Sequence, residues 1–176
     1  MAKIILDAGH GGSDPGAVFE GRQEKDDTLA LVLAIGEILS ENGVEVFYTR
    51  TVDKYESPYE KAAEGNSSGG DYFVSIHRNS SPYPNTYSGV ETLLYSSYGA
   101  AYELAVNINE QLEKVGFVNL GVNERPNLVV LRDTQMPSVL VEVGFINTEN
   151  DNWLLDSSFQ DVAQAIADGI LLTVWG

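Results

Sequence analysis

The amino-acid sequence predicts a single α/β domain: a twisted, mostly parallel sheet of about six strands with helices on both faces. Short apolar runs alternate along the chain with segments of helical periodicity, which is the pattern of β-α-β units. The 176 residues contain no internal repeat and no linker-like stretch, and a chain of this length can bury one core. We therefore expect residues 1–176 to form one domain.

Candidate strands are short runs rich in apolar residues, mostly bounded by Gly, Asn, Asp or Pro. The predicted strands are residues 3–8, 44–49, 71–77, 89–95, 128–132 and 138–143.

Four segments, residues 23–42, 57–67, 99–115 and 158–174, have helical character. The first of them carries an apolar stripe at helical spacing, and Gly43 follows where glycine commonly ends a helix. In the second, Ser57 precedes Pro58, which is typical of an N-cap followed by proline at the first helical position. Ser158 is the expected N-cap of the last helix.

Composition excludes several functional classes. The formal net charge of −16 argues against binding to nucleic acids and to anionic membranes, both of which require Lys and Arg. No apolar stretch approaches the ~20 residues that membrane insertion requires. Cysteine is absent, so a zinc site would have to use histidine and carboxylate ligands. Serine-hydrolase, P-loop and dinucleotide-binding motifs are also absent.

The chain has only two histidines, and each stands where a predicted strand ends. His10 follows the first strand and lies among glycines, whereas His77 closes the third. Parallel sheets bind ligands at the carboxyl ends of their strands, and imidazole is the commonest metal ligand in proteins. The pair therefore suggests a metal site, with Asp7 or Asp14 as the carboxylate that orients His10. Alternatively, each histidine is an ordinary loop or strand-end residue.

Two glutamates occupy positions where an unpaired charge would be costly. Glu24 lies on the apolar stripe of the first helix, one turn before Thr28, although acidic residues are also common in a first helical turn. Glu142 interrupts a strongly apolar strand. It is either a general acid or base with a shifted pKa, or one half of a buried ion pair with Arg132. Asn79, beyond His77, either orients a substrate amide or forms an Asx turn.

Together these residues match a catalytic zinc site. Such a site uses three protein ligands and keeps one position open for water. Two histidines and one glutamate supply that set, and a second glutamate can then transfer protons. This combination suggests metal-assisted hydrolysis of an amide.

Several motifs, in the same order along nearly the whole chain, carry a resemblance to a known family. The segment 7–17 (DAGHGGSDPGA), the pair Thr49-Arg50, the segment 75–79 (SIHRN), Gly89-Val90-Glu91 and the segment 136–147 (MPSVLVEVGFIN) all contribute. They resemble the zinc-dependent N-acetylmuramoyl-L-alanine amidases.

The resemblance implies an α/β domain with one Zn²⁺ held by His10, Glu24 and His77, and with Glu142 as the catalytic acid and base. It implies peptidoglycan as the substrate, cut between the lactyl carbonyl of N-acetylmuramic acid and the amine of L-alanine. Asn79 and Arg132 are expected to contact that substrate. Two alternatives remain open: an inactive wall-binding module of the same fold, and another zinc amidohydrolase or peptidase.

This function places the protein at the bacterial cell wall. The N-terminus shows no signal-peptide pattern. The expectation is therefore either a lysin that stays in the cytoplasm until release, or a domain of an exported protein. Anionic wall polymers should repel a domain of charge −16, so a separate cell-wall-binding module outside this chain is expected.

Overall fold

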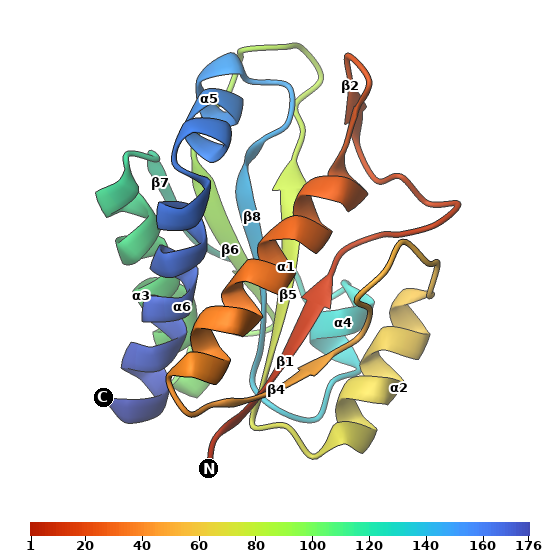
Figure 1. Cartoon of the computed structure of the whole chain (residues 1–176), viewed down its shortest axis with the longest axis vertical. Coiled ribbons are helices and arrows are strands. Elements are labelled where there is room, and N and C mark those ends of the chain that lie inside the picture. Colours follow the sequence, from red (N-terminus) through yellow and green to blue (C-terminus); the bar gives the residue numbers. More distant parts are fainter.

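The computed structural model of the protein describes residues 1–176 and shows one domain of three layers, a central sheet with helices on both faces (Figure 1). The predicted α/β class is therefore confirmed. No helix combines the length and the apolar character that crossing a membrane would require.

The central sheet has six strands in the order β4-β1-β5-β8-β6-β7. Every neighbouring pair is parallel except β6 and β8, which are antiparallel. A small antiparallel hairpin, β2–β3, stands apart from this sheet. The strands are β1 (Lys3–Ala8), β2 (Val18–Phe19), β3 (Arg22–Gln23), β4 (Glu45–Tyr48), β5 (Tyr72–Asn79), β6 (Val90–Leu94), β7 (Asn119–Glu124) and β8 (Ser138–Phe145).

Six helices surround the sheet: α1 (Glu24–Glu41), α2 (Pro58–Ser68), α3 (Gly99–Val115), α4 (Val129–Arg132), α5 (Glu149–Ser157) and α6 (Phe159–Trp175). Helices α1, α3 and α6 pack together on one face, and α2 and α4 lie on the other (Figure 1). The larger core of 28 buried residues lies under the first group, where the helices present wide apolar stripes.

The second face of the sheet is covered less completely. Its core is a cluster of only six buried residues, Ile5, Phe73, Leu93, Val130, Leu131 and Leu140. Helices α2 and α4 are short and cannot reach across the whole face. Toward the carboxyl ends of β1, β5 and β8 the apolar residues give way to polar ones, and this uncovered part of the face is where the candidate site lies.

The strand predicted at residues 128–132 is wrong: this segment forms the single helical turn α4. A short apolar run cannot be assigned to strand or buried helix by periodicity, and here Val130 and Leu131 pack under the sheet. The sixth strand is instead β7, Asn119–Glu124, which lies at the edge of the sheet. Because β7 is partly exposed and contains Gly and Asn, its apolar signal is weak.

The predicted helix ends were correct in part. Ser57 caps α2: its hydroxyl accepts from the Glu60 amide, and the Glu60 carboxylate accepts from the Ser57 amide. Ser158 precedes α6 as predicted, but its side chain forms no capping hydrogen bond. Helix α5 was not predicted, because it is short and carries four acidic or amide residues in its first turns, a composition that resembles a loop.

Candidate metal centre

The loop after β1 places His10 at the edge of the sheet where the parallel strands have their carboxyl ends. His10 adopts a positive φ of 64°, which few non-glycine residues do. Two buried cations, Arg50 and Lys61, bind the carbonyl groups of this loop: Arg50 donates to Ala8 and Gly9 at 3.0 and 3.1 Å, and Lys61 donates to Ala8 at 2.6 Å. These bonds support the unusual backbone path at His10.

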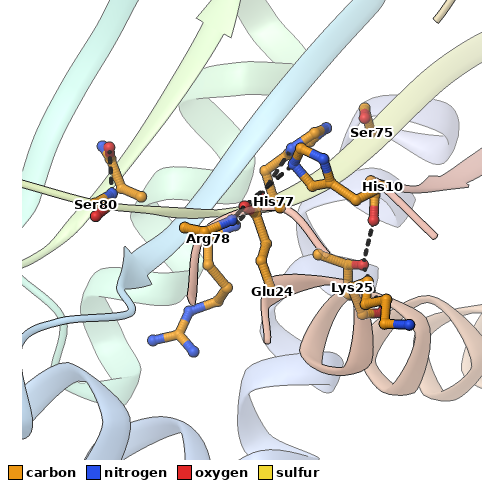
Figure 2. Close-up of polar contacts among 12 residues, drawn as sticks. His10, Glu24, Lys25, Ser75, His77, Arg78 and Ser80 are labelled. Atoms are coloured by element: carbon orange, nitrogen blue, oxygen red, sulfur yellow. Dashed lines mark hydrogen bonds and ion pairs between the residues drawn. The ribbon is translucent and has the colours of Figure 1, made fainter. Parts of the chain in front are cut away.

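His10, Glu24 and His77 converge from three different elements, the loop after β1, the first turn of α1 and the end of β5 (Figure 2). Nε2 of His10 lies 3.1 Å from Oε2 of Glu24, and Nδ1 of His77 lies 3.1 Å from Oε1 of the same carboxylate. The two imidazole rings are 5.0 Å apart and nearly perpendicular. One potential ligand atom from each residue lies within 4.8 Å of the others, a set that could hold a metal ion.

The carboxylate of Glu24 is fixed in place by the backbone. Its Oε2 accepts from the amide of Ala17 at 2.8 Å, and its Oε1 accepts from the amide of Arg78 at 3.0 Å. The side chain is buried, as its position on the helix stripe predicted. A carboxylate that is oriented before any ligand arrives loses little entropy on binding one.

Asp14 and Asp7 were the two candidates for the carboxylate that orients His10, and the structure gives them different partners. Asp14 accepts from Nδ1 of His10 at 2.8 Å, so it is the residue that orients this ring. The expected contact from Asp7 to His10 is wrong. Asp7 is buried and pairs with Lys61 at 2.9 Å, and it also accepts from Ser75 and Thr49. It therefore joins β1, β5 and α2.

The electrostatics of the cluster are those of a carboxylate between two bases. Burial would raise the pKa of Glu24, but its hydrogen bonds to His10 and His77 hold that pKa well below its usual range. Burial would likewise lower the pKa of His10, yet Glu24 and Asp14 raise it to about 9. The charge of Glu24 thus attracts a positive partner, which is a proton on histidine or a metal ion.

Glu142 lies beside this cluster on β8, as the register partner of His77 on β5. Its Oε2 is shielded from solvent and has no hydrogen-bond partner in the protein. Burial raises the pKa of Glu142 to about 7, with opposing effects from His77 and from Glu24. A carboxyl group with this pKa can both accept and release a proton near neutral pH.

Arg132 does not pair with Glu142, so the predicted buried ion pair is wrong. Arg132 ends α4 with its side chain 44% exposed and forms its ion pair with the adjacent Asp133 at 2.8 Å. It lines a separate surface hollow together with Tyr95 and Tyr98. The ion-pair prediction depended on a strand at 128–132, and the helical turn found there carries Arg132 away. A substrate contact of Arg132 remains a prediction.

Asn79 ends β5 close to the cluster, and its side chain forms two hydrogen bonds, neither of them that of an Asx turn. Its Oδ1 accepts from the backbone amide of the next residue, Ser80, at 2.9 Å. Its amide nitrogen donates to Glu91 of β6 at 3.2 Å. A role in binding substrate remains a prediction for Asn79.

A pocket of about 260 Å³ opens beside the cluster. Its lining includes His10 and His77 together with residues of α2 and α4, among them Lys61 and Val130. The histidines are therefore accessible from this pocket. A substrate group in this pocket would face a potential metal centre, with Glu142 on the strand next to His77.

Gly9 allows the cluster to assemble, because a Cβ there would lie only 2.4 Å from Cε1 of His77. We expect Gly9→Ala to displace the His77 ring by about 1 Å, a shift that can cost about 100-fold in catalytic rate. The steady-state rate and bound metal of purified Gly9→Ala measure this effect. Gly36→Ala is the matched control: its Cβ would meet only Tyr48, far from the site, so activity should persist. Unchanged activity in Gly9→Ala would show that the ring position is not critical.

Comparison with known proteins assigns the chain to a family. Residues 4–171 match the family model described as N-acetylmuramoyl-L-alanine amidase. A sporulation-specific N-acetylmuramoyl-L-alanine amidase of Bacillus subtilis (strain 168) is 40% identical over 97% of this chain and 67% of its own length. An endolysin of Bacillus phage SPP1 is 38% identical over 97% of this chain and 65% of its own. The chain thus spans about two thirds of these relatives.

Solved structures show the same fold. An N-acetylmuramoyl-L-alanine amidase from Clostridium difficile 630 superposes with a TM-score of 0.93 at 31% identity, over 99% of this chain and 97% of that one. The catalytic domain of CwlV, an N-acetylmuramoyl-L-alanine amidase from Bacillus (Paenibacillus) polymyxa var. colistinus, gives 0.90 at 34% identity, over 99% and 98%. The family model, the sequence relatives and the fold agree, and the chain belongs to the N-acetylmuramoyl-L-alanine amidase family.

Proposed function

We propose that this protein is a zinc-dependent amidase that hydrolyses the bond between N-acetylmuramic acid and L-alanine in peptidoglycan. The observation that carries the proposal is the placement of Glu142 beside the convergent set His10, Glu24 and His77. A binding module would need the fold but not a proton-transferring carboxyl group next to three potential metal ligands. The family relationship supports peptidoglycan as the substrate.

The donor set suits zinc. Two imidazole nitrogens and one carboxylate oxygen, with no thiolate, form a ligand combination found in zinc hydrolases. Zinc bound there would polarise the scissile carbonyl and make a water molecule more acidic. Asp14 would orient His10 through its Nδ1 atom, and the amides of Ala17 and Arg78 would keep the Glu24 carboxylate in place.

Glu142 performs the proton transfers in this proposal. Its unpartnered oxygen is free to accept a proton from the attacking water. Its raised pKa then lets the same group donate that proton to the departing nitrogen of L-alanine, so that the amine leaves in a neutral form. One residue thus serves as base in the first step and as acid in the second.

The test is the chemical identity of the bond that is cut. The protein is incubated with purified peptidoglycan, and new amino termini are labelled and identified. The proposal predicts that L-alanine appears as a new amino terminus and that peptide-free glycan accumulates. New termini only at other residues would identify a peptidase, and no release at all by metal-loaded protein would identify an inactive wall-binding module.

We further propose that the protein acts at the bacterial cell wall, with its affinity for the wall supplied by a separate module. The support is the net charge of −16, which opposes adsorption to anionic wall polymers. Tight binding of this chain alone to whole walls, insensitive to salt, would contradict this part of the proposal.

A further inference from the structure

Beyond Glu142, polar side chains continue across the uncovered face of the sheet. Glu142 on β8 is the register partner of His77 on one side and of Glu91 on β6 on the other. Register partners project from the same face of a sheet, so these three side chains form a row. Asn123 of the edge strand β7 extends the row through a hydrogen bond to Glu91.

Glu91 is held in place by hydrogen bonds, but no cation neutralises its charge. Its Oε1 accepts from the side-chain amide of Asn79 at 3.2 Å, and its Oε2 accepts from the side-chain amide of Asn123 at 2.9 Å. No Lys or Arg pairs with Glu91, although the side chain is partly buried and another carboxylate, Glu142, is its neighbour. Each carboxylate oxygen can accept two hydrogen bonds, so both keep acceptor capacity. A partly buried carboxylate without a cation is costly if its only task is structural.

The order of the strands gives the row a direction. If the proposed function holds, the scissile carbonyl lies at the histidine cluster on β1 and β5, and the scissile nitrogen faces Glu142 on β8. The next strands in the same direction are β6 and β7. The part of the substrate that follows the nitrogen, which is the stem peptide, therefore passes over Glu91 and Asn123.

We propose that Glu91, held by Asn79 and Asn123, is a specificity-determining residue that accepts hydrogen bonds from the backbone N–H groups of the stem peptide. This inference takes the path of the stem peptide from the proposed function, but its residues lie outside the candidate metal centre. Peptide N–H groups are the donors that a fixed carboxylate next to the leaving nitrogen would meet first. Hydrogen bonds to a charged acceptor typically contribute about ten- to hundredfold to binding.

The experiment compares two soluble substrates, one carrying a stem peptide and one ending at L-alanine. We expect Glu91→Gln to raise KM for the peptide-bearing substrate about tenfold, with kcat changed little, and to leave KM for the short substrate unchanged. Asn123→Ala should act in the same direction more weakly. Glu103→Gln, the same exchange at an exposed position on α3, is the matched control and should change neither KM.

The peptide contact is also measured without catalysis, by calorimetric titration of the free stem peptide into wild-type protein and into Glu91→Gln. Weaker peptide binding by the variant, at unchanged thermal stability and metal content, supports the inference even if the wild type cleaves neither substrate, which would refute the proposed function alone. Equal peptide affinity of the two proteins, or an equal rise in KM for both substrates, would overturn the inference.

Discussion

Replacing Glu142 with glutamine should greatly slow turnover and leave the fold and the metal in place. Glutamine keeps the size of the side chain but can neither take nor return a proton at neutral pH. General acid–base catalysis typically contributes 10²- to 10⁴-fold, so kcat should fall by about that factor. The exchange should not reduce stability, because it keeps the size of the side chain and removes an ionisable group whose charged form is disfavoured by burial.

The measurement is kcat on a soluble muramoyl-peptide, together with metal content and thermal unfolding of the same preparation. Glu103→Gln, an exposed exchange of the same kind, should retain full activity. Loss of metal from Glu142→Gln would make Glu142 a ligand instead of a proton carrier. Retention of activity within a few-fold of wild type would remove it from the mechanism.

Removing any one of His10, Glu24 or His77 should cost the protein its zinc and, with it, its activity. A three-ligand site has no spare donor, so one loss leaves two ligands and a much weaker site. His10→Ala, Glu24→Gln and His77→Ala are compared for zinc content after equilibration with a defined free zinc concentration. Glutamine is chosen at position 24 because its carbonyl oxygen can still accept from the amides of Ala17 or Arg78.

Asp14→Asn provides a graded comparison for the ligand variants. Asp14 contacts His10 at Nδ1 and is not a member of the ligand set, so its loss should weaken zinc binding about 10- to 100-fold without abolishing it. Full zinc content in any of the three ligand variants would exclude that residue from the ligands. A loss in Asp14→Asn as complete as in the ligand variants would make Asp14 a ligand.

The four central residues could be predicted because each stands out locally. A parallel sheet gathers the carboxyl ends of its strands at one edge, so two strand-end histidines are expected to be neighbours. The phase of the first helix turns Glu24 toward the same edge. Glu142 interrupts an apolar strand, and a charged residue there needs a specific reason.

Some residues have roles that were not predicted or were predicted wrongly. These roles depend on contacts between segments that are distant in the sequence. Arg50 and Lys61 are buried because they bind backbone carbonyl groups of the loop before His10, and carbonyl groups leave no trace in a sequence. Asp7 pairs with Lys61 rather than with His10, which follows from the docking of α2 on the sheet. Predicting such partners requires knowledge of how the helices pack on the sheet, and not only of where they lie in the sequence.

The same limit explains the misplaced strand. Residues 128–132 and 119–124 are the two candidates for the sixth strand of the sheet, and apolar content alone favours the wrong one. The edge position tolerates the polar β7, because one side of an edge strand lacks a partner and its residues are partly exposed. The apolar turn α4 is needed instead to close the smaller core, where Val130 and Leu131 are buried.

Zinc dependence and bond specificity are measured together by the release of L-alanine amino termini from purified peptidoglycan as zinc is titrated into chelator-treated wild-type protein. We expect no release by the metal-free protein and full activity at one equivalent of bound zinc. Undiminished release by protein shown to contain no metal would contradict it.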